Sequence, residues 1–385
     1  MHEQCRFNDS ASSLRENGLQ FLSMYSHFEE VVQSMAVPST ASNRVLIQQL
    51  VKISLPIIQQ NPDFGCAVRC RMRILQFWQD QSQNVDGTQL SSTHRVNKDK
   101  GFSDIESELQ IVSKILEKHL KSYTMWRYRR WLISLFAAHQ PVRTLRGSTL
   151  VDELRSVEHL LELDYRNFHA WNHRRWVVDI IHSLTDVAPL KANQQFSRKV
   201  ITSCFGNYSA WHERMVSQHN ITCAVAVQED LDLVRNAMYC DPTDECAFLY
   251  ADGIVRQLSE KMKVYLDPLQ QRTTFSMSLR AIIHACVELM EMEANMLRWP
   301  LWLLFRITQR SAEMTNTEST EMLELLSLYS RRIAAVIKMS RLEENCTFNV
   351  EKAHEYYQTV FLQSLCIVDP SRKGCYLDLL KGTRG

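Results

Sequence analysis

Apolar residues recur every three or four positions along most of the chain, which is the spacing that places them on one face of an α-helix. Two clear stripes run from Leu109 to Leu120 and from Leu150 to Leu161. A residue that can cap a new helix, Ser122 or Asn167, follows each stripe within a few positions. The pattern therefore predicts pairs of amphipathic helices joined by short turns.

The second helix of each predicted pair carries a repeated motif. Three gap-free copies occupy Ser122–Arg129, Asn167–Arg174 and Asn207–Arg214. Each copy has a capping residue, an aromatic residue next to it, Trp four positions after the cap and Arg three positions after the Trp. The tryptophans are 45 and 40 residues apart. A motif with this period predicts an all-α solenoid of stacked helical hairpins.

Degenerate copies flank these three. Val68 and Phe248 stand where the Trp is expected, and Ala251-Asp252 replaces His-Arg. A further copy contains Arg298–Trp302, and a last one is expected at Asp369–Tyr376. The second helices are therefore predicted near residues 64–78, 122–136, 167–182, 207–218, 243–257 and 296–310.

The copies divide the chain into an N-terminal segment, residues 1–45, and a repeat domain, residues 46–385. We expect the repeat domain to form a right-handed superhelical solenoid. Val68 and Trp126 are 58 residues apart, and the polar stretch 81–101 accounts for the excess over the usual period. Its composition predicts a solvated, mobile insertion between two hairpins.

The motif residues have a structural interpretation. A hairpin cannot cover its own apolar side, so each Trp is expected to anchor one hairpin against the next. Each Arg is expected to tie adjacent helices together through carbonyl groups or carboxylates. The residues assigned to this structural role are Trp126, Arg129, Asn167, Trp171, Arg174, Asn207, Trp211 and Arg214.

Composition and charge exclude several classes of protein. With 10 Gly and 9 Pro, the chain has too few turn formers for a many-stranded sandwich or barrel. Its 44 basic and 43 acidic residues leave no field for nucleic acid or an anionic membrane. No apolar run approaches the ~20 residues of a membrane span, and the polar N-terminus predicts no signal peptide. The 11 cysteines contain no CxxC pair, so we expect reduced thiols and a cytoplasmic protein.

Catalytic motifs are missing from the sequence. It contains no HExxH, no phosphate-binding Gly-rich loop and no nucleophile elbow. His169 and His173, and likewise Cys66 and Cys70, have the i, i+4 spacing that can chelate a metal on a helix. Both pairs lie inside copies of the repeat motif, so we expect structural roles for them and no intrinsic metal site.

The segment Asn167-Phe-His-Ala-Trp-Asn-His-Arg-Arg-Trp176, repeated with a period near 40, resembles the repeat of the alpha subunits of heterodimeric protein prenyltransferases. Within that family, the chain is most similar to the alpha subunits of Rab-directed geranylgeranyltransferases. Supporting segments are Asn61-Pro-Asp-Phe64, Lys121-Ser-Tyr123, Val368-Asp-Pro370 and the opening Met1-His2. The resemblance implies a helical crescent that wraps a beta subunit built as an αα-barrel.

The resemblance also implies a function. The heterodimer would transfer geranylgeranyl from geranylgeranyl diphosphate to C-terminal cysteines of Rab GTPases, which an escort protein presents. The catalytic zinc would be held by the beta subunit and not by this chain. Two alternatives stay open: the alpha subunit of farnesyltransferase or type I geranylgeranyltransferase, acting on CaaX proteins, and a non-catalytic scaffold. The motif differs from the 34-residue tetratricopeptide pattern, which disfavours the scaffold.

Three sites follow from the resemblance. Lys121, with Tyr123 beside it, matches the catalytic Lys that faces the diphosphate of the lipid substrate. Lys121 also precedes a helix start, where free N–H groups are expected to favour an anion. Arg166 holds the equivalent place one repeat later and is the second candidate for the diphosphate. His2 is a possible autoinhibitory ligand to the beta-subunit zinc.

Overall fold

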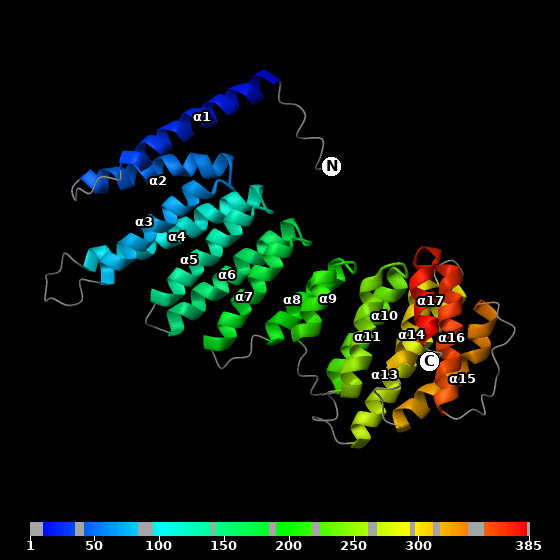
Figure 1. Ribbon diagram of the computed structural model, residues 1–385. Helices are drawn as coiled ribbons and strands as arrows, with labels where there is room; N and C mark the ends of the chain where they lie inside the picture. The colour runs from blue at the N-terminus through cyan, green and yellow to red at the C-terminus, as the bar shows by residue number, and fades with distance from the viewer. Residues whose placement is uncertain are drawn as a thin grey trace. The chain divides into compact units, whose positions relative to one another are not determined.

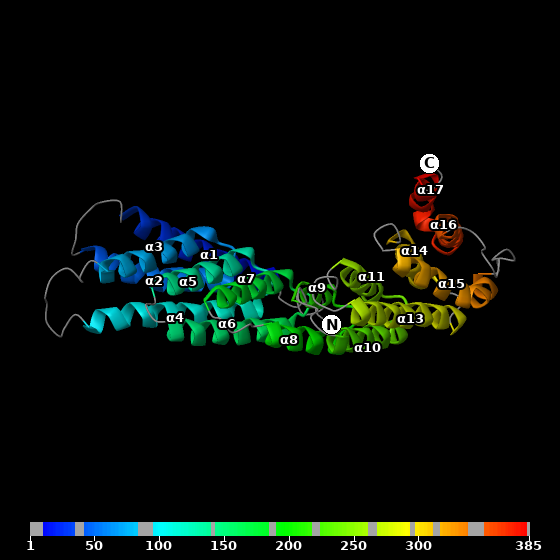
Figure 2. The same ribbon diagram turned by 90° about the horizontal axis from the view of Figure 1, so that it is seen from below.

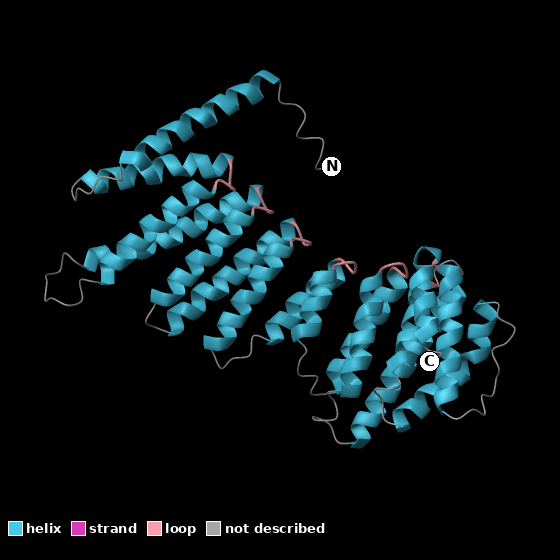
Figure 3. Ribbon diagram, viewed as in Figure 1, coloured by secondary structure: helices cyan, strands magenta, loops and turns pink. Residues whose placement is uncertain are grey.

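The computed structural model describes residues 11–34, 42–83, 95–139, 143–184, 190–217, 224–260, 268–292, 297–310, 316–337 and 350–382. Every regular element in these ranges is helical, with no strand among them (Figure 3), so the predicted all-α class is confirmed. None of the helices in these ranges is both long and apolar enough to cross a membrane. The chain divides into two units, Met1–Ala188 and Pro189–Gly385.

The first unit consists of helical hairpins preceded by one long helix (Figure 1). Its helices are α1 (Ala11–Ser34), α2 (Ser42–Gln60), α3 (Gly65–Gln83), α4 (Arg95–Lys118), α5 (Tyr123–His139), α6 (Arg143–Leu163) and α7 (Phe168–Leu184). The hairpins are α2/α3, α4/α5 and α6/α7, and α1 packs along α2. Figure 2 shows α4 and α6 in one layer and α3, α5 and α7 in the other. The second helices therefore stack on one another, α3 on α5 and α5 on α7, and α4 stacks on α6.

The second unit continues the same pattern of pairs. Its elements are α8 (Leu190–Ser203), α9 (Tyr208–Ser217), α10 (Ala224–Cys240), α11 (Glu245–Glu260), α13 (Pro268–Met292), α14 (Arg298–Gln309), α15 (Asn316–Ile337), α16 (Val350–Val368), the 3-10 turn η3 (Pro370–Arg372) and α17 (Lys373–Gly382). The pairs α8/α9, α10/α11 and α13/α14 are hairpins, while α15 packs on α13 and α16 on α14. The described helices of this unit thus form a helical-repeat solenoid, in which α15 also packs on α16 and α16 on α17.

The six predicted second helices correspond to α3, α5, α7, α9, α11 and α14, each starting one or two residues later than expected. The stretch 81–101 differs from the prediction, because α3 continues to Gln83 and α4 already begins at Arg95. Adding a residue to an existing helix costs little, so packed helices extend into polar sequence. Residues 84–94 lie outside the described part of the chain. The N-terminal segment 1–45 contains α1, whose Phe21, Tyr25 and Phe28 surround Phe64 edge-on.

The Trp of the motif closes the turn that precedes its own helix. Its indole Nε1 donates to the carbonyl oxygen six residues earlier, from Trp126 to Leu120 at 2.8 Å and from Trp171 to Tyr165 at 2.9 Å. Trp211 does the same with Phe205, at 2.6 Å. The three indole rings are buried in the core. Val68 and Phe248 are buried as well but have no indole donor, so their turns lack this hydrogen bond.

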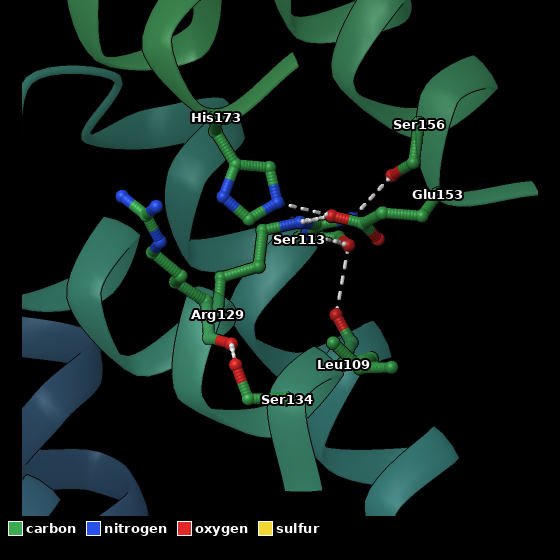
Figure 4. Close-up of polar contacts among 8 residues, drawn as sticks. Leu109, Ser113, Arg129, Ser134, Glu153, Ser156 and His173 are labelled. Atoms are coloured by element: carbon green, nitrogen blue, oxygen red, sulfur yellow. Dashed lines mark hydrogen bonds and ion pairs between the residues drawn. The ribbon is translucent and has the colours of Figure 1, made fainter. Parts of the chain in front are cut away.

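The Arg of the motif forms a buried ion pair with the next hairpin (Figure 4). Arg129 on α5 holds Glu153 on α6 with two hydrogen bonds, Nε to Oε1 at 2.6 Å and Nη2 to Oε2 at 2.8 Å. Its Nη1 donates to Ser113 on α4 at 2.7 Å. His173 on α7 completes the group, with Nε2 2.7 Å from Glu153 Oε1. One carboxylate therefore joins two hairpins.

The same arrangement recurs on both sides. Glu108 on α4 accepts from Arg71 on α3 and, at 2.8 Å, from the hydroxyl of Tyr128. In the second unit Asp230 on α10 accepts from Arg214 at 2.7 Å and from Tyr250 at 2.9 Å. In all three groups the second donor lies 20 residues after the acid. The repeat thus has an acid on its first helix that the eight-residue motif does not contain.

Two positions keep a polar link in altered form. Ala251 replaces the Arg of the motif, and the neighbouring Asp252 pairs with Arg310, the residue just after α14, through bonds of 2.7 and 2.8 Å. The acid and the Arg are thus exchanged between the two hairpins. Arg174 bonds to Glu158 of its own hairpin at 3.1 and 2.9 Å. The polar link between helices therefore survives changes in which helix carries the acid.

The environment of Glu153 sets the charge of this buried group. Burial by itself would raise the pKa of Glu153, but the Arg129 guanidinium and the His173 hydrogen bond outweigh it and lower that pKa to about 2. Burial lowers the pKa of His173, which favours the neutral ring. Glu153 is consequently a carboxylate, and neutral His173 donates its Nε2 proton to it.

We expect Trp171→Ala to lower the free energy of unfolding by ~3–5 kcal/mol, because the buried ring leaves a cavity and the turn loses its indole donor. The matched control is Phe168→Ala, which removes a ring that is 50% exposed on the same helix. That control should cost ~1 kcal/mol or less. Urea unfolding followed by circular dichroism measures both. Equal losses would show that Trp171 is no special anchor.

Glu153 should make stability depend on pH in the acid range. A folded pKa of about 2 against an ordinary 4.5 means that its contribution is complete above about pH 4.5 and is lost as the pH falls from there toward 2. At neutral pH, Glu153→Gln should therefore lower stability by ~3 kcal/mol. The difference from the parent should shrink below pH 4.5, whereas the exposed control Glu162→Gln should change little at any pH. A difference that stays constant down to pH 3 would contradict this account.

Candidate functional site

The turns inside the hairpins lie along one edge of each unit (Figure 3). In the hairpins from α2/α3 to α10/α11, each turn has four residues, and the N–H of the fourth bonds to the carbonyl of the first, at 3.0 Å in both His119–Ser122 and Asp164–Asn167. The residue just before the cap occupies the same position in every copy. Along the chain these residues are Asp63, Lys121, Arg166, Gly206 and Thr243. Only Lys121 and Arg166 in this set are cations, which singles out the α4–α5 and α6–α7 turns.

Lys121 reaches toward the following turn. Its side chain is 80% exposed, and its Nζ lies 3.8 Å from Asp164 Oδ2. The other oxygen of Asp164 accepts a hydrogen bond from the Arg166 backbone N–H at 3.1 Å. This carboxylate could not be predicted from the sequence, because the contact joins two different hairpins. Asp164 thus contacts the Lys121 side chain and the backbone of Arg166.

The helix start beside Lys121 is already occupied, which corrects the expectation of free N–H groups there. Ser122 Oγ accepts from Met125 N at 3.2 Å and donates to Asp63 Oδ1 at 2.7 Å. Thr124 N also donates to Asp63 Oδ1, at 3.2 Å. The next helix is similar, since Asn167 Oδ1 accepts from the backbone at the start of α7. An anion at Lys121 would therefore be held by side chains.

An exposed aromatic cluster adjoins Lys121. The Tyr123 ring is 68% exposed and meets the His169 ring edge-on, with centroids 4.2 Å apart. Phe168 lies against both, 6.1 Å from Tyr123 and 3.9 Å from His169. Burial lowers the pKa of His169, while the Asp63 carboxylate acts in the opposite direction. Arg166 lies at this edge too, with its guanidinium 5.6 Å from the Tyr165 ring.

The two members of each i, i+4 pair lie in different surroundings. His173 turns into the core toward Glu153, whereas His169 faces Tyr123 at the edge. Cys66 is exposed and accepts a bond from Arg69, and burial raises the pKa of the half-buried Cys70. Across the described ranges, no group of three or more His, Cys, Asp or Glu residues is placed to hold a metal ion. His2 lies outside the described residues.

Comparison with protein families matches two segments of this chain. Residues 105–136 and 150–181 match the protein prenyltransferase alpha subunit repeat. They cover the α4/α5 and α6/α7 hairpins, with Lys121, Trp126, Arg166 and Trp171. The curated relatives include geranylgeranyl transferase type-2 subunit alpha of Rattus norvegicus, 26% identical over 217 residues, and that of Homo sapiens, 25% identical over the same length.

These two hairpins are therefore similar to the repeat of protein prenyltransferase alpha subunits. The match covers 53% of this chain and 33% of each of these two relatives, so it spans about a third of their length. Among solved structures, Candida albicans protein geranylgeranyltransferase-I complexed with GGPP is 19% identical, with a TM-score of 0.34 over 75% of this chain and 92% of that chain.

Proposed function

We propose that this chain is the alpha subunit of a heterodimeric protein geranylgeranyltransferase. Its substrates would be geranylgeranyl diphosphate and the C-terminal cysteines of Rab GTPases presented by an escort protein, and its place would be the cytoplasm. The repeat family supports the subunit type, and the relatives named type-2 subunit alpha support the Rab-directed class. The observation that carries the proposal is the pair of cations, Lys121 and Arg166, at equivalent positions of the two matched hairpins.

The proposal divides the chemistry between two chains. Zinc, which binds the acceptor cysteine as a thiolate, is assigned to the beta subunit. Among the described residues, His169 and His173 diverge and no cluster of ligands is placed to hold a metal ion, which supports this assignment. The contribution of this chain is positive charge at the leaving diphosphate.

Lys121 is suited to that contribution. Negative charge accumulates on the departing diphosphate oxygens in the transition state, and a cation already in place there lowers the barrier. An exposed pair at 3.8 Å, such as Lys121 with Asp164, is worth at most ~1 kcal/mol. A diphosphate carries more charge than one carboxylate, so it can displace Asp164. Arg166 can add a two-pronged contact to phosphate oxygens, and the exposed Tyr123 can offer its hydroxyl.

The first test is assembly with candidate beta subunits. We expect the chain to co-purify with the beta subunit of a Rab-directed enzyme and the complex to prenylate Rab proteins in the presence of an escort protein. Transfer to CaaX peptides with the other beta subunits would instead support the farnesyltransferase or type I class. Failure to pair with any beta subunit would support the scaffold and contradict the proposal.

The second test addresses Lys121 in the heterodimer. Lys121→Ala should slow single-turnover transfer by ~10–1000-fold, because the charge acts where the barrier is set. Stability should hardly change, since the side chain is exposed. Lys121→Arg should keep part of the rate. The matched control is Lys118→Ala, an exposed lysine in the last turn of α4. Equal rates for Lys121→Ala and Lys118→Ala would show that Lys121 is an ordinary surface lysine and would contradict its catalytic role.

A further inference from the structure

The segment that carries Lys121 and Tyr123 is held by a residue from the preceding hairpin. Asp63, in the turn between α2 and α3, accepts from Ser122 Oγ at 2.7 Å and from Thr124 N at 3.2 Å. A single oxygen, Oδ1, takes both hydrogen bonds, although the donors lie 59 and 61 residues further along the chain. The two donors flank Tyr123, one as a side-chain hydroxyl and one as a backbone N–H, so Asp63 contacts the segment on both sides of Tyr123.

The following hairpin holds the same segment from the other side. Asn167 is buried, and its Nδ2 donates to the carbonyl oxygen of Leu120 at 2.6 Å. Trp126 Nε1 donates to that carbonyl as well, at 2.8 Å. The segment is therefore held just before Lys121 by Asn167 of the following hairpin, and just after it by Asp63 of the preceding hairpin. The Lys121 side chain extends from this frame toward Asp164 and is 80% exposed.

Asp63 differs from the acids and amides at the first position of the turns. Asn61, Asp164 and Asp241 each accept from the backbone N–H two residues later and so brace their own turn. Asp63 occupies the position in its repeat that Lys121 occupies in the next one. Its Oδ1 accepts hydrogen bonds from the neighbouring turn and not from its own. Burial would raise the pKa of Asp63, but the bonds from Ser122 and Thr124 outweigh it and lower that pKa, so the side chain is ionised at neutral pH.

The charge of Asp63 has the wrong sign to attract a diphosphate. A carboxylate beside an anion site weakens binding by repulsion, so any benefit from Asp63 must come from geometry. We propose that Asp63 is a positioning residue, which orders the Lys121–Tyr123 segment for contact with the leaving diphosphate. The inference rests on the proposed function of Lys121.

The experiment compares three variants in the heterodimer. Asp63→Ala removes the acceptor and should slow single-turnover transfer by ~10-fold or more. Asp63→Asn keeps an acceptor oxygen and should stay within ~3-fold of the parent. Amide hydrogen exchange supplies a readout besides activity, since Thr124 and Met125 should exchange faster in Asp63→Ala than in Asp63→Asn. The matched control is Asp241→Ala, which removes a turn acceptor in the second unit and should leave transfer unchanged.

The outcomes separate the two claims. A slow Lys121→Ala enzyme together with a parental rate in Asp63→Ala would overturn the positioning role and leave the proposed function standing. Parental rates in both would overturn both. Equal slowing in Asp63→Asn and Asp63→Ala would show that charge and not hydrogen bonding matters, which also contradicts the inference. Asp63→Asn guards against misfolding, because it preserves both hydrogen bonds to the α5 start.

Discussion

The buried ion pair between an Arg of one hairpin and a carboxylate of the next is the constraint on which the repeat depends. Arg129 and Glu153 are both shielded from water, and leaving either alone there would cost several kcal/mol. The two charges therefore meet only when the two hairpins stack in one register. Apolar contacts alone would allow more than one register. Arg71–Glu108 and Arg214–Asp230 impose the same condition elsewhere, and Asp252–Arg310 imposes it with the charges exchanged.

Register in the core determines what the turns can do. Once neighbouring hairpins are aligned, their turns lie side by side, and each can reach the next: Asp63 bonds to the α5 start, and Lys121 pairs with Asp164. Asp63 and Lys121 share one repeat position, so the same geometry that makes Asp63 a brace aims Lys121 along the turn edge. The proposed diphosphate contact thus uses a position that serves a structural role in the preceding repeat.

The sequence predicts the helices well because their signal is local. The stripe from Leu150 to Leu161 and the caps at Ser122 and Asn167 depend only on nearby residues. Partners from other hairpins were missed for the opposite reason. Glu153 lies within the apolar stripe of its helix, and an acid at such a position indicates a buried ion pair. The neighbouring sequence does not identify Arg129 as its partner. The occupation of the α5 start by Asp63 was likewise invisible, so the expected free N–H groups were wrong.

The most direct test of the central constraint is a double-mutant cycle on Arg129 and Glu153, measured as the free energy of unfolding at neutral pH. Arg129→Met and Glu153→Met should each cost ~3–5 kcal/mol, because each leaves a buried charge without its partner. The double variant should cost at least ~2 kcal/mol less than the sum of the two. Additive costs would mean that the pair does not act as a unit, and would contradict the view that it sets the register of the hairpins.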